Sequence, residues 1–143
     1  MSAIKFLLRK GEELDRLAIH SLLASYEMEA DLPPSDFMVV EINGQLAGAA
    51  RLEWEDQGVY VRPILVNPAW RRRSIGTALI RALTQNLSVL HVVARGQAIG
   101  FYRKLGFQPM SWDQVPERYR DECETCPNSN TCHPEPMVLT VSL

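Results

Sequence analysis

The chain has 143 residues, of which 46% are hydrophobic and 22% are charged, a composition typical of one soluble globular domain. Its formal net charge of −2 argues against nucleic-acid binding, which requires a basic surface. No apolar run approaches the ~18 residues that a membrane span needs, and the apolar stretch at the N-terminus is too short for a signal peptide. We therefore expect a single domain over residues 1–143, a cytoplasmic location, and no nucleic-acid or membrane partner.

The first part of the chain predicts a strand, a helix and a hairpin. Residues 3–8 favour a short apolar strand, and a helical pattern begins at Glu12. The apolar residues expected on one face of this helix are Leu14, Leu17, Ala18, Leu22 and Leu23. Strands over 37–42 and 45–54 flank Asn43-Gly44, a dipeptide that strongly favours a tight hairpin turn.

The second part alternates strands and helices. We expect strands over 59–66, 87–94, 107–112 and 138–143, and helices over 75–86 and 97–105. Pro63 interrupts the first of these strands, and because proline removes a ladder donor, it predicts a bulge or a break in pairing. An antiparallel meander followed by a β-α-β unit indicates an α/β (α+β) fold with a mixed central sheet flanked by helices.

A basic, glycine-bearing loop joins the strand before it to the helix after it. A helix start presents unpaired backbone N–H groups and the positive end of its dipole. Arg71, Arg72 and Arg73 add positive charge there, and Gly76 lets a ligand approach the backbone. This arrangement suits a pyrophosphate, although an ordinary strand–helix junction with a solvated basic turn would have the same residues.

Two motifs resemble those of the GNAT N-acetyltransferases. Residues 71–76 read RRRSIG, similar to the family's acetyl-CoA motif of Gln or Arg, two variable residues, Gly, one variable residue, and Gly or Ala. Residues 98–107 read AIGFYRKLGF, similar to the family's segment with Ala, an aromatic-Tyr pair and Gly-Phe. Ser74 replaces the first motif glycine, and we expect an ordinary φ there. The resemblance implies a GNAT-like fold.

The same resemblance implies how acetyl-CoA binds. The basic loop would hold the pyrophosphate, and the main chain of the preceding strand would pair with the pantetheine arm. The expected cofactor-binding residues are Leu65, Val66, Arg71, Arg72, Arg73, Ser74, Ile75, Gly76, Thr77 and Phe101. Ordinary core packing explains the side chains of the strand equally well, and Phe101 could pack inside the protein or against the cofactor.

Tyr102 is the residue that the resemblance implies for catalysis. A phenol near the sulfur can protonate the leaving thiolate; the alternative is a packing role with its hydroxyl on a backbone carbonyl. Many family members carry a glutamate base roughly six residues before the equivalent of Val66, where this chain has Tyr60. Glu53, Glu55 or an ordered water would have to accept the proton of the amine.

Two arginines are candidates for binding the acceptor. Arg51 and Arg62 lie on neighbouring predicted strands and could hold a carboxylate by bidentate bonds; cross-strand ion pairs with Glu53 or Glu41 are the alternative. The expected function is transfer of acetyl from acetyl-CoA to a small-molecule amine, by direct attack in a ternary complex. A non-catalytic acyl-CoA sensor or a metal-loop interaction module is the alternative.

The link over 113–136 is unusually long and carries all the cysteines. Cys123, Cys126, Cys132 and His133 could supply the four ligands of a tetrahedral zinc site. His20, His91 or a non-protein group could replace His133 as the fourth ligand, because adjacent Cys and His ligands are less common than spaced ones. An iron–sulfur cluster, inert reduced thiols and a redox disulfide are the alternatives.

This Cys-rich tail between the last two strands resembles the ending of some short proteins related to N-acetylglutamate synthase. That resemblance implies glutamate or another amino acid as the acceptor, with Arg51 or Arg62 as its carboxylate clamp. Edge strands and the last strand could contribute to a homodimer.

Overall fold

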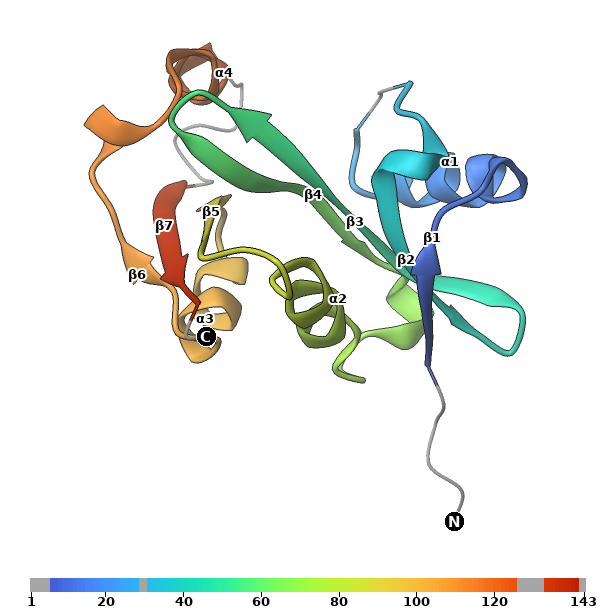
Figure 1. Cartoon of the computed structure of the whole chain (residues 1–143). Helices are drawn as coiled ribbons and strands as arrows, with labels where there is room; N and C mark the ends of the chain where they lie inside the picture. Colours follow the sequence, from blue (N-terminus) through green and yellow to red (C-terminus); the bar gives the residue numbers. More distant parts are fainter. Residues whose placement is uncertain (1–5, 29–30, 126–132, 142–143) are drawn as a thin grey trace. The chain divides into compact units, whose positions relative to one another are not determined.

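A computed structural model describes residues 6–28, 31–125 and 133–141. The strands are β1 (Leu7–Lys10), β2 (Phe37–Ile42), β3 (Gln45–Glu55), β4 (Gly58–Val66), β5 (Val89–Ala94), β6 (Gln108–Pro109) and β7 (Glu135–Thr140), and the helices are α1 (Arg16–Ser25), α2 (Ile75–Leu83), α3 (Ala98–Lys104) and α4 (Glu117–Thr125) (Figure 1). The strand order is β1-β2-β3-β4-β5-β7-β6. The β4–β5 pair is parallel and the β5–β7 pair antiparallel. The predicted mixed sheet flanked by helices is confirmed.

The chain divides into two compact units. The first unit comprises residues 1–52 and 62–86, and the second comprises residues 53–61 and 87–143. Strands β3 and β4 contribute residues to both units. No helix in the described ranges is long and apolar enough to cross a membrane.

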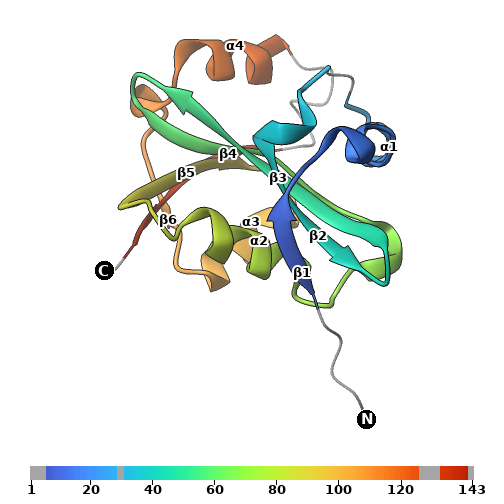
Figure 2. The same cartoon turned by 45° about the vertical axis from the view of Figure 1, so that its right-hand side comes forward.

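In the first unit, α1 and α2 cover opposite faces of the strands (Figure 2). Ala49 of β3 belongs to a buried cluster with Ile19 and Leu23 of α1. The preceding residue, Gly48, faces α2: a Cβ there would lie 2.8 Å from Cγ2 of Ile75. Because successive strand residues point to opposite faces, the glycine lets α2 pack closely on one face while α1 covers the other.

The predicted buried face of the first helix is wrong in part. Leu14 and Leu17 are 94% and 83% exposed, whereas Ile19 is fully buried. Ala18 is also exposed, and the predicted Leu22 and Leu23 are buried. Residues 13–15 form a 3-10 turn, so the α-helix begins only at Arg16. The buried positions 19, 22 and 23 then follow the i, i+3, i+4 spacing of an amphipathic helix.

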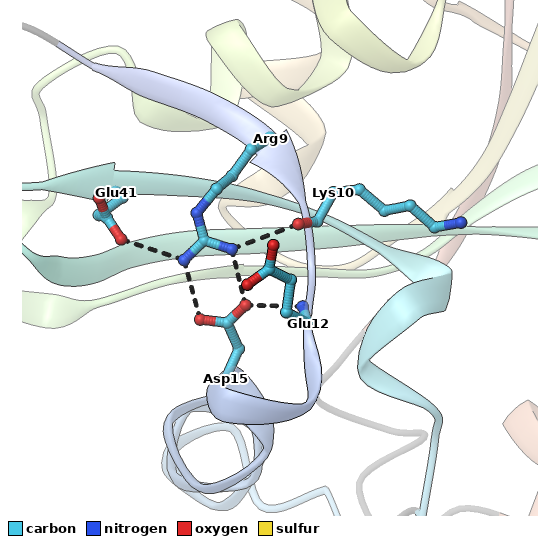
Figure 3. Close-up of polar contacts among 5 residues, drawn as sticks. All are labelled: Arg9, Lys10, Glu12, Asp15 and Glu41. Carbon is cyan, nitrogen blue, oxygen red and sulfur yellow. Dashed lines mark hydrogen bonds and ion pairs between the residues drawn. The ribbon is translucent and has the colours of Figure 1, made fainter.

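Arg9 fixes the entry to α1 by contacting two elements (Figure 3). Its guanidinium donates two hydrogen bonds to the Asp15 carboxylate, at 2.7 and 2.9 Å, and one to Glu41 of β2 at 3.0 Å. The same carboxylate accepts a bond from the Glu12 N–H at 2.8 Å. The Arg9 bonds hold the pKa of Asp15 below its usual range. This network ties β1, the 3-10 turn and β2 together.

In the second unit, β5 lies between β4 and β7. Tyr60 pairs with His91 in parallel, and β7 pairs with β5 along its whole length. α4 lies on one face of these strands and α3 on the other (Figure 2). Tyr60, Val115 and Tyr119 form a buried cluster on the α4 face.

Several predicted boundaries shift, and the long link contains structure. The strand expected over 107–112 is reduced to the two residues of β6, because residues 112–114 form a 3-10 turn. The link over 113–136 holds α4, whose first turn follows Pro116, a residue that is favoured at a helix start. The final strand begins at Glu135 rather than at Val138. The first strand lies at 7–10, and residues 1–5 are outside the described residues.

The predicted hairpin turn between β2 and β3 is confirmed. Asn43 and Gly44 have φ values of 52° and 76°, and both residues of a type I′ turn require a positive φ.

Candidate active site

Asn67 fixes the start of the basic loop at the end of β4. Its N–H donates to the carbonyl of Ala47 on β3 at 2.8 Å. Its side chain accepts a bond from the N–H of Ala69 at 3.0 Å and so caps the short 3-10 turn Pro68–Trp70. The loop therefore begins from a defined position.

Two residues of the basic loop have a left-handed backbone. Arg72 and Ser74 both have a φ of 63°, and Ser74 lies directly before the first residue of α2. Left-handed residues next to right-handed ones turn successive N–H groups toward one point, where an anion can bind. The expectation of an ordinary φ at Ser74 is wrong: the serine adopts a left-handed backbone, a conformation that glycine adopts most readily.

The three loop arginines are exposed. The Cζ atom of Arg71 lies 6.0 Å from the centre of the Tyr26 ring, and that of Arg73 lies 5.8 Å from the Trp70 ring. Among the described carboxylates, none forms an ion pair with Arg71, Arg72 or Arg73. Their charge is therefore not neutralised by these groups. Gly76 and Thr77 follow in the half-buried first turn of α2, and Ile75 is buried.

The end of β4 presents the peptide groups of Val66 to a tyrosine. Leu65 is fully buried, and its carbonyl oxygen faces Gly48 of β3. The N–H and the carbonyl of Val66 both point away from β3. The N–H of Val66 donates to the hydroxyl of Tyr26 at 3.1 Å, and this hydroxyl donates to the carbonyl of Val66 at 3.2 Å. A side chain just after α1 thus occupies main-chain groups that we expected to contact pantetheine.

Arg51 and Arg62 lie together in the first unit. Nη1 of Arg51 donates to the carbonyl of Arg62 at 3.2 Å, and its Nε lies 3.9 Å from Asp36. The Arg51 side chain is only 16% exposed, and Arg62 is half-buried. Glu41, an alternative partner suggested by the sequence, bonds Arg9 instead.

Tyr102 lies on α3 with its side chain 2% exposed. Its ring makes edge contacts with the rings of Phe101 and Phe107, each with centroids 5.0 Å apart. These contacts fix the ring direction of Tyr102, and Phe101 remains half-buried.

Both carboxylates named as alternative bases bind α4. Oε1 of Glu53 accepts bonds from Arg118 and from the hydroxyl of Tyr119, the latter at 2.6 Å. Glu55 accepts a bond from Nε of Arg118 at 2.7 Å. The sequence interpretation missed Arg118 and Tyr119 because it predicted no helix in the long link over 113–136.

Tyr60 and His91 form a stacked pair on the α4 face. Their ring centroids are 4.9 Å apart with an interplanar angle of 25°. The Tyr60 side chain is 1% exposed, and its hydroxyl has no hydrogen-bond partner in the described part of the chain. Burial, with the charge of Glu55 adding a smaller effect, raises the pKa of Tyr60 to about 12. Nδ1 of His91 lies 3.1 Å from the carbonyl oxygen of Val59.

The proposed metal ligands are described only in part. Cys123 on α4 is half-buried, and His133 is exposed. Cys126 and Cys132 lie outside the described residues. Among the residues that are described, no three His, Cys, Asp or Glu side chains gather as a metal-binding group. Zinc and iron–sulfur binding stay predictions.

Comparison with known proteins identifies the family. Residues 33–109, more than half of the chain, match the model of the acetyltransferase (GNAT) domain. The chain belongs to the GNAT acetyltransferase family. It is also 24% identical over 110 residues to an uncharacterized N-acetyltransferase of Chlorobaculum tepidum, covering 74% of this chain and 71% of that protein.

Two solved structures share the fold. N-acetylglutamate synthase from Neisseria gonorrhoeae, complexed with coenzyme A and N-acetyl-glutamate, aligns with 99% of this chain at a TM-score of 0.77 and 19% identity. The chain spans only 36% of that synthase. Diaminobutyrate acetyltransferase from Paenibacillus lautus, in complex with diaminobutyric acid and coenzyme A, aligns at a TM-score of 0.65 and 14% identity, covering 96% of each chain.

Proposed function

We propose that this protein transfers an acetyl group from acetyl-CoA to the amine of a small molecule. The observation that carries the proposal is the basic loop before α2, where two left-handed residues and three arginines surround a helix start. This loop falls within the matched family domain, and the synthase and the diaminobutyrate enzyme are both described in complex with coenzyme A.

In this proposal each part of the first unit has a role in binding acetyl-CoA. Backbone N–H groups over 73–77 bind the pyrophosphate, and the guanidinium groups of 71–73 neutralise its charge. The main chain of β4 at Leu65 and Val66 is the binding edge for pantetheine. Val66 is the better donor and acceptor of the two, because its peptide groups point away from β3.

Tyr102 is proposed as the general acid. When the tetrahedral intermediate collapses, the C–S bond breaks, and the hydroxyl of Tyr102 gives its proton to the leaving thiolate. Such assistance typically accelerates a reaction by ~10²–10⁴-fold. The two ring contacts of Tyr102 support the proposal because they hold the phenol in one orientation.

The proposed acceptor is an amino acid. The synthase is described with N-acetyl-glutamate, and the second enzyme with diaminobutyric acid. Arg51 donates to the backbone carbonyl of Arg62, and a guanidinium binds a carboxylate well because its donors match the two oxygens. We therefore assign the carboxylate of the acceptor to this arginine pair.

Titration calorimetry with acetyl-CoA tests the cofactor site first. We expect saturable binding that Gly76→Val abolishes while the melting temperature stays close to that of the unchanged protein. Unchanged affinity in this variant would place the pyrophosphate elsewhere.

Turnover separates an enzyme from an acyl-CoA sensor. A panel of amino acids that includes glutamate and diaminobutyrate should yield acetylated product. Tyr102→Phe should lower kcat by ~10²–10⁴-fold with acetyl-CoA affinity retained, whereas Tyr119→Phe, which removes a phenol hydroxyl elsewhere in the second unit, should not. Tight binding of acetyl-CoA without turnover across the panel would favour the sensor.

A further inference from the structure

Acetyl transfer to an amine requires a group that removes a proton from nitrogen. An ammonium has no lone pair, so it must be deprotonated before it can attack the thioester carbonyl. In the second unit, Tyr60 and His91 lie on neighbouring strands, and Glu53 and Glu55 lie on the β3–β4 hairpin. If the proposed function holds, these groups and an ordered water are the candidates that could accept the proton.

The carboxylates near Tyr60 are already engaged. Glu53 accepts bonds from Arg118 and Tyr119, and Glu55 accepts a bond from Arg118. Their oxygens are therefore occupied by the side chains of α4 and are not open to an acceptor amine. Tyr60 is not a base near neutral pH, because burial keeps its hydroxyl protonated.

Besides an ordered water, His91 is the candidate that remains, and its contacts select the tautomer that a base needs. A carbonyl oxygen only accepts hydrogen bonds, so the 3.1 Å contact with Val59 requires a proton on Nδ1. In the neutral ring Nε2 then carries the lone pair. Within the described residues, Nε2 has no hydrogen-bond partner.

The ring of His91 is also held in place on both sides. Tyr60 stacks on it at 4.9 Å. On Gly58, a Cβ would lie 2.6 Å from Cε1 of the imidazole, so only glycine leaves room for the ring there. A base that is oriented by a hydrogen bond and by packing matches the arrangement that general-base catalysis uses.

We infer that His91 is the general base of the proposed acetyl transfer, oriented by Val59, Gly58 and Tyr60. Nε2 takes one proton from the acceptor ammonium and passes it to solvent. The free amine forms the C–N bond and the thiolate leaves. After the C–N bond has formed, the nitrogen loses a second proton, which returns to the Tyr102 oxygen. Tyr102 has given its own proton to the leaving sulfur, so protons and charge balance.

The test rests on the proposed function and uses His91→Asn, which retains a donor for the Val59 carbonyl but has no Nε2 lone pair. With glutamate as acceptor, or with the best amino acid of the panel, we expect kcat to fall ~100-fold or more. Acetyl-CoA affinity measured by calorimetry should be unchanged. The matched control is His20→Asn, the same change at a half-exposed histidine of α1, which should retain full activity.

Rescue by imidazole distinguishes a base from a structural residue. In His91→Ala, imidazole added to the assay should restore part of the rate, in proportion to its free-base concentration, and should do nothing for Tyr102→Phe. Full activity in His91→Asn, or no rescue in a folded His91→Ala, would overturn the inference while leaving acetyl transfer intact. Failure of the unchanged protein to turn over any amine would count against the proposed function instead.

A long-range ¹H–¹⁵N spectrum of the imidazole tests the tautomer without any acceptor. We expect the proton on Nδ1 and a deprotonated Nε2 in the neutral ring. The opposite tautomer would contradict the inference even if the enzyme were active.

Discussion

Ser74 shows how one residue can depart from a motif and keep its geometry. The serine adopts a left-handed backbone, with φ 63° and ψ 21°, which costs a residue with a side chain about 1–2 kcal/mol. The loop therefore retains the conformation that a glycine would adopt, at the expense of local strain.

Replacing this serine by glycine should relieve the strain. For Ser74→Gly we expect the free energy of unfolding to rise by up to about 1 kcal/mol, because the greater freedom of glycine in the unfolded chain offsets part of the gain. Ser74→Val should lower it by about 1–2 kcal/mol, because a β-branched side chain tolerates a left-handed backbone less well than serine does. Urea denaturation measures both, and a stabilised valine variant would contradict the conformation described.

Asp15 should make stability depend on pH in the acid range. Its pKa is lowered in the folded protein, chiefly by the bonds from Arg9. The group therefore contributes stability above its unfolded pKa of about 3.9, and this contribution is lost as pH falls through the lower folded value.

We expect Asp15→Asn to lower the free energy of unfolding at pH 7 by about 1–3 kcal/mol, because Arg9 loses a charged partner. The variant should also lose part of the fall in stability between pH 5 and pH 2, measured by denaturation at a series of pH values. Glu13→Gln, in an exposed pair, is the control and should change little.

At the scale of elements, α4 depends on one aromatic side chain. Tyr119 is 3% exposed and packs edge-on against Tyr60, while its hydroxyl bonds Glu53. The other residues of this helix are mostly exposed and polar, so the helix is attached through one face.

The two parts of Tyr119 should contribute differently to stability. Tyr119→Phe, which removes only the bond to Glu53, should lower the free energy of unfolding by about 0.5–1.5 kcal/mol. Tyr119→Ala, which also empties the buried cluster, should lower it by about 3–5 kcal/mol. Equal effects of the two changes in urea denaturation would show that packing under α4 is unimportant.

The sequence predicts most elements but not α4, for a physical reason. Amphipathic strands and helices reveal themselves by repeated apolar positions, as in α2, where Ile75, Leu79 and Ile80 are buried. Residues 117–125 contain only one large apolar residue, Tyr119, so no period is visible. The prediction of the buried face of α1 is wrong for a related reason: the 3-10 turn before this helix changes which apolar residues face inward.

In the candidate site too, features within one short segment could be predicted from the sequence, whereas contacts between distant segments could not. The basic loop is predictable because its motif is contiguous. The bond of Tyr26 to Val66 joins residues 40 positions apart, and that of Arg118 to Glu53 joins residues 65 apart. Spacing along one sequence carries no information about such pairs.

At the scale of the whole molecule, the cysteines predict that the stability of the protein depends on a bound metal. Metal binding to a segment contributes to its folding free energy. Cys126→Ser should therefore release zinc, measured by elemental mass spectrometry, and lower the melting temperature of the full chain. Metal-free protein with an unchanged melting temperature would exclude a structural zinc site, and iron in the sample would favour the cluster.

The hydroxyl of Tyr26 competes with any ligand for the main-chain groups at the end of β4. It fills both hydrogen-bonding groups of Val66, so the edge of the strand is satisfied without any ligand. A ligand amide that pairs with Val66 must replace the two bonds of the Tyr26 hydroxyl. The apparent affinity of the ligand is therefore its intrinsic affinity multiplied by the fraction of molecules in which Tyr26 has left Val66. Departure of the ligand is then assisted, because the vacated groups find a partner within the same chain.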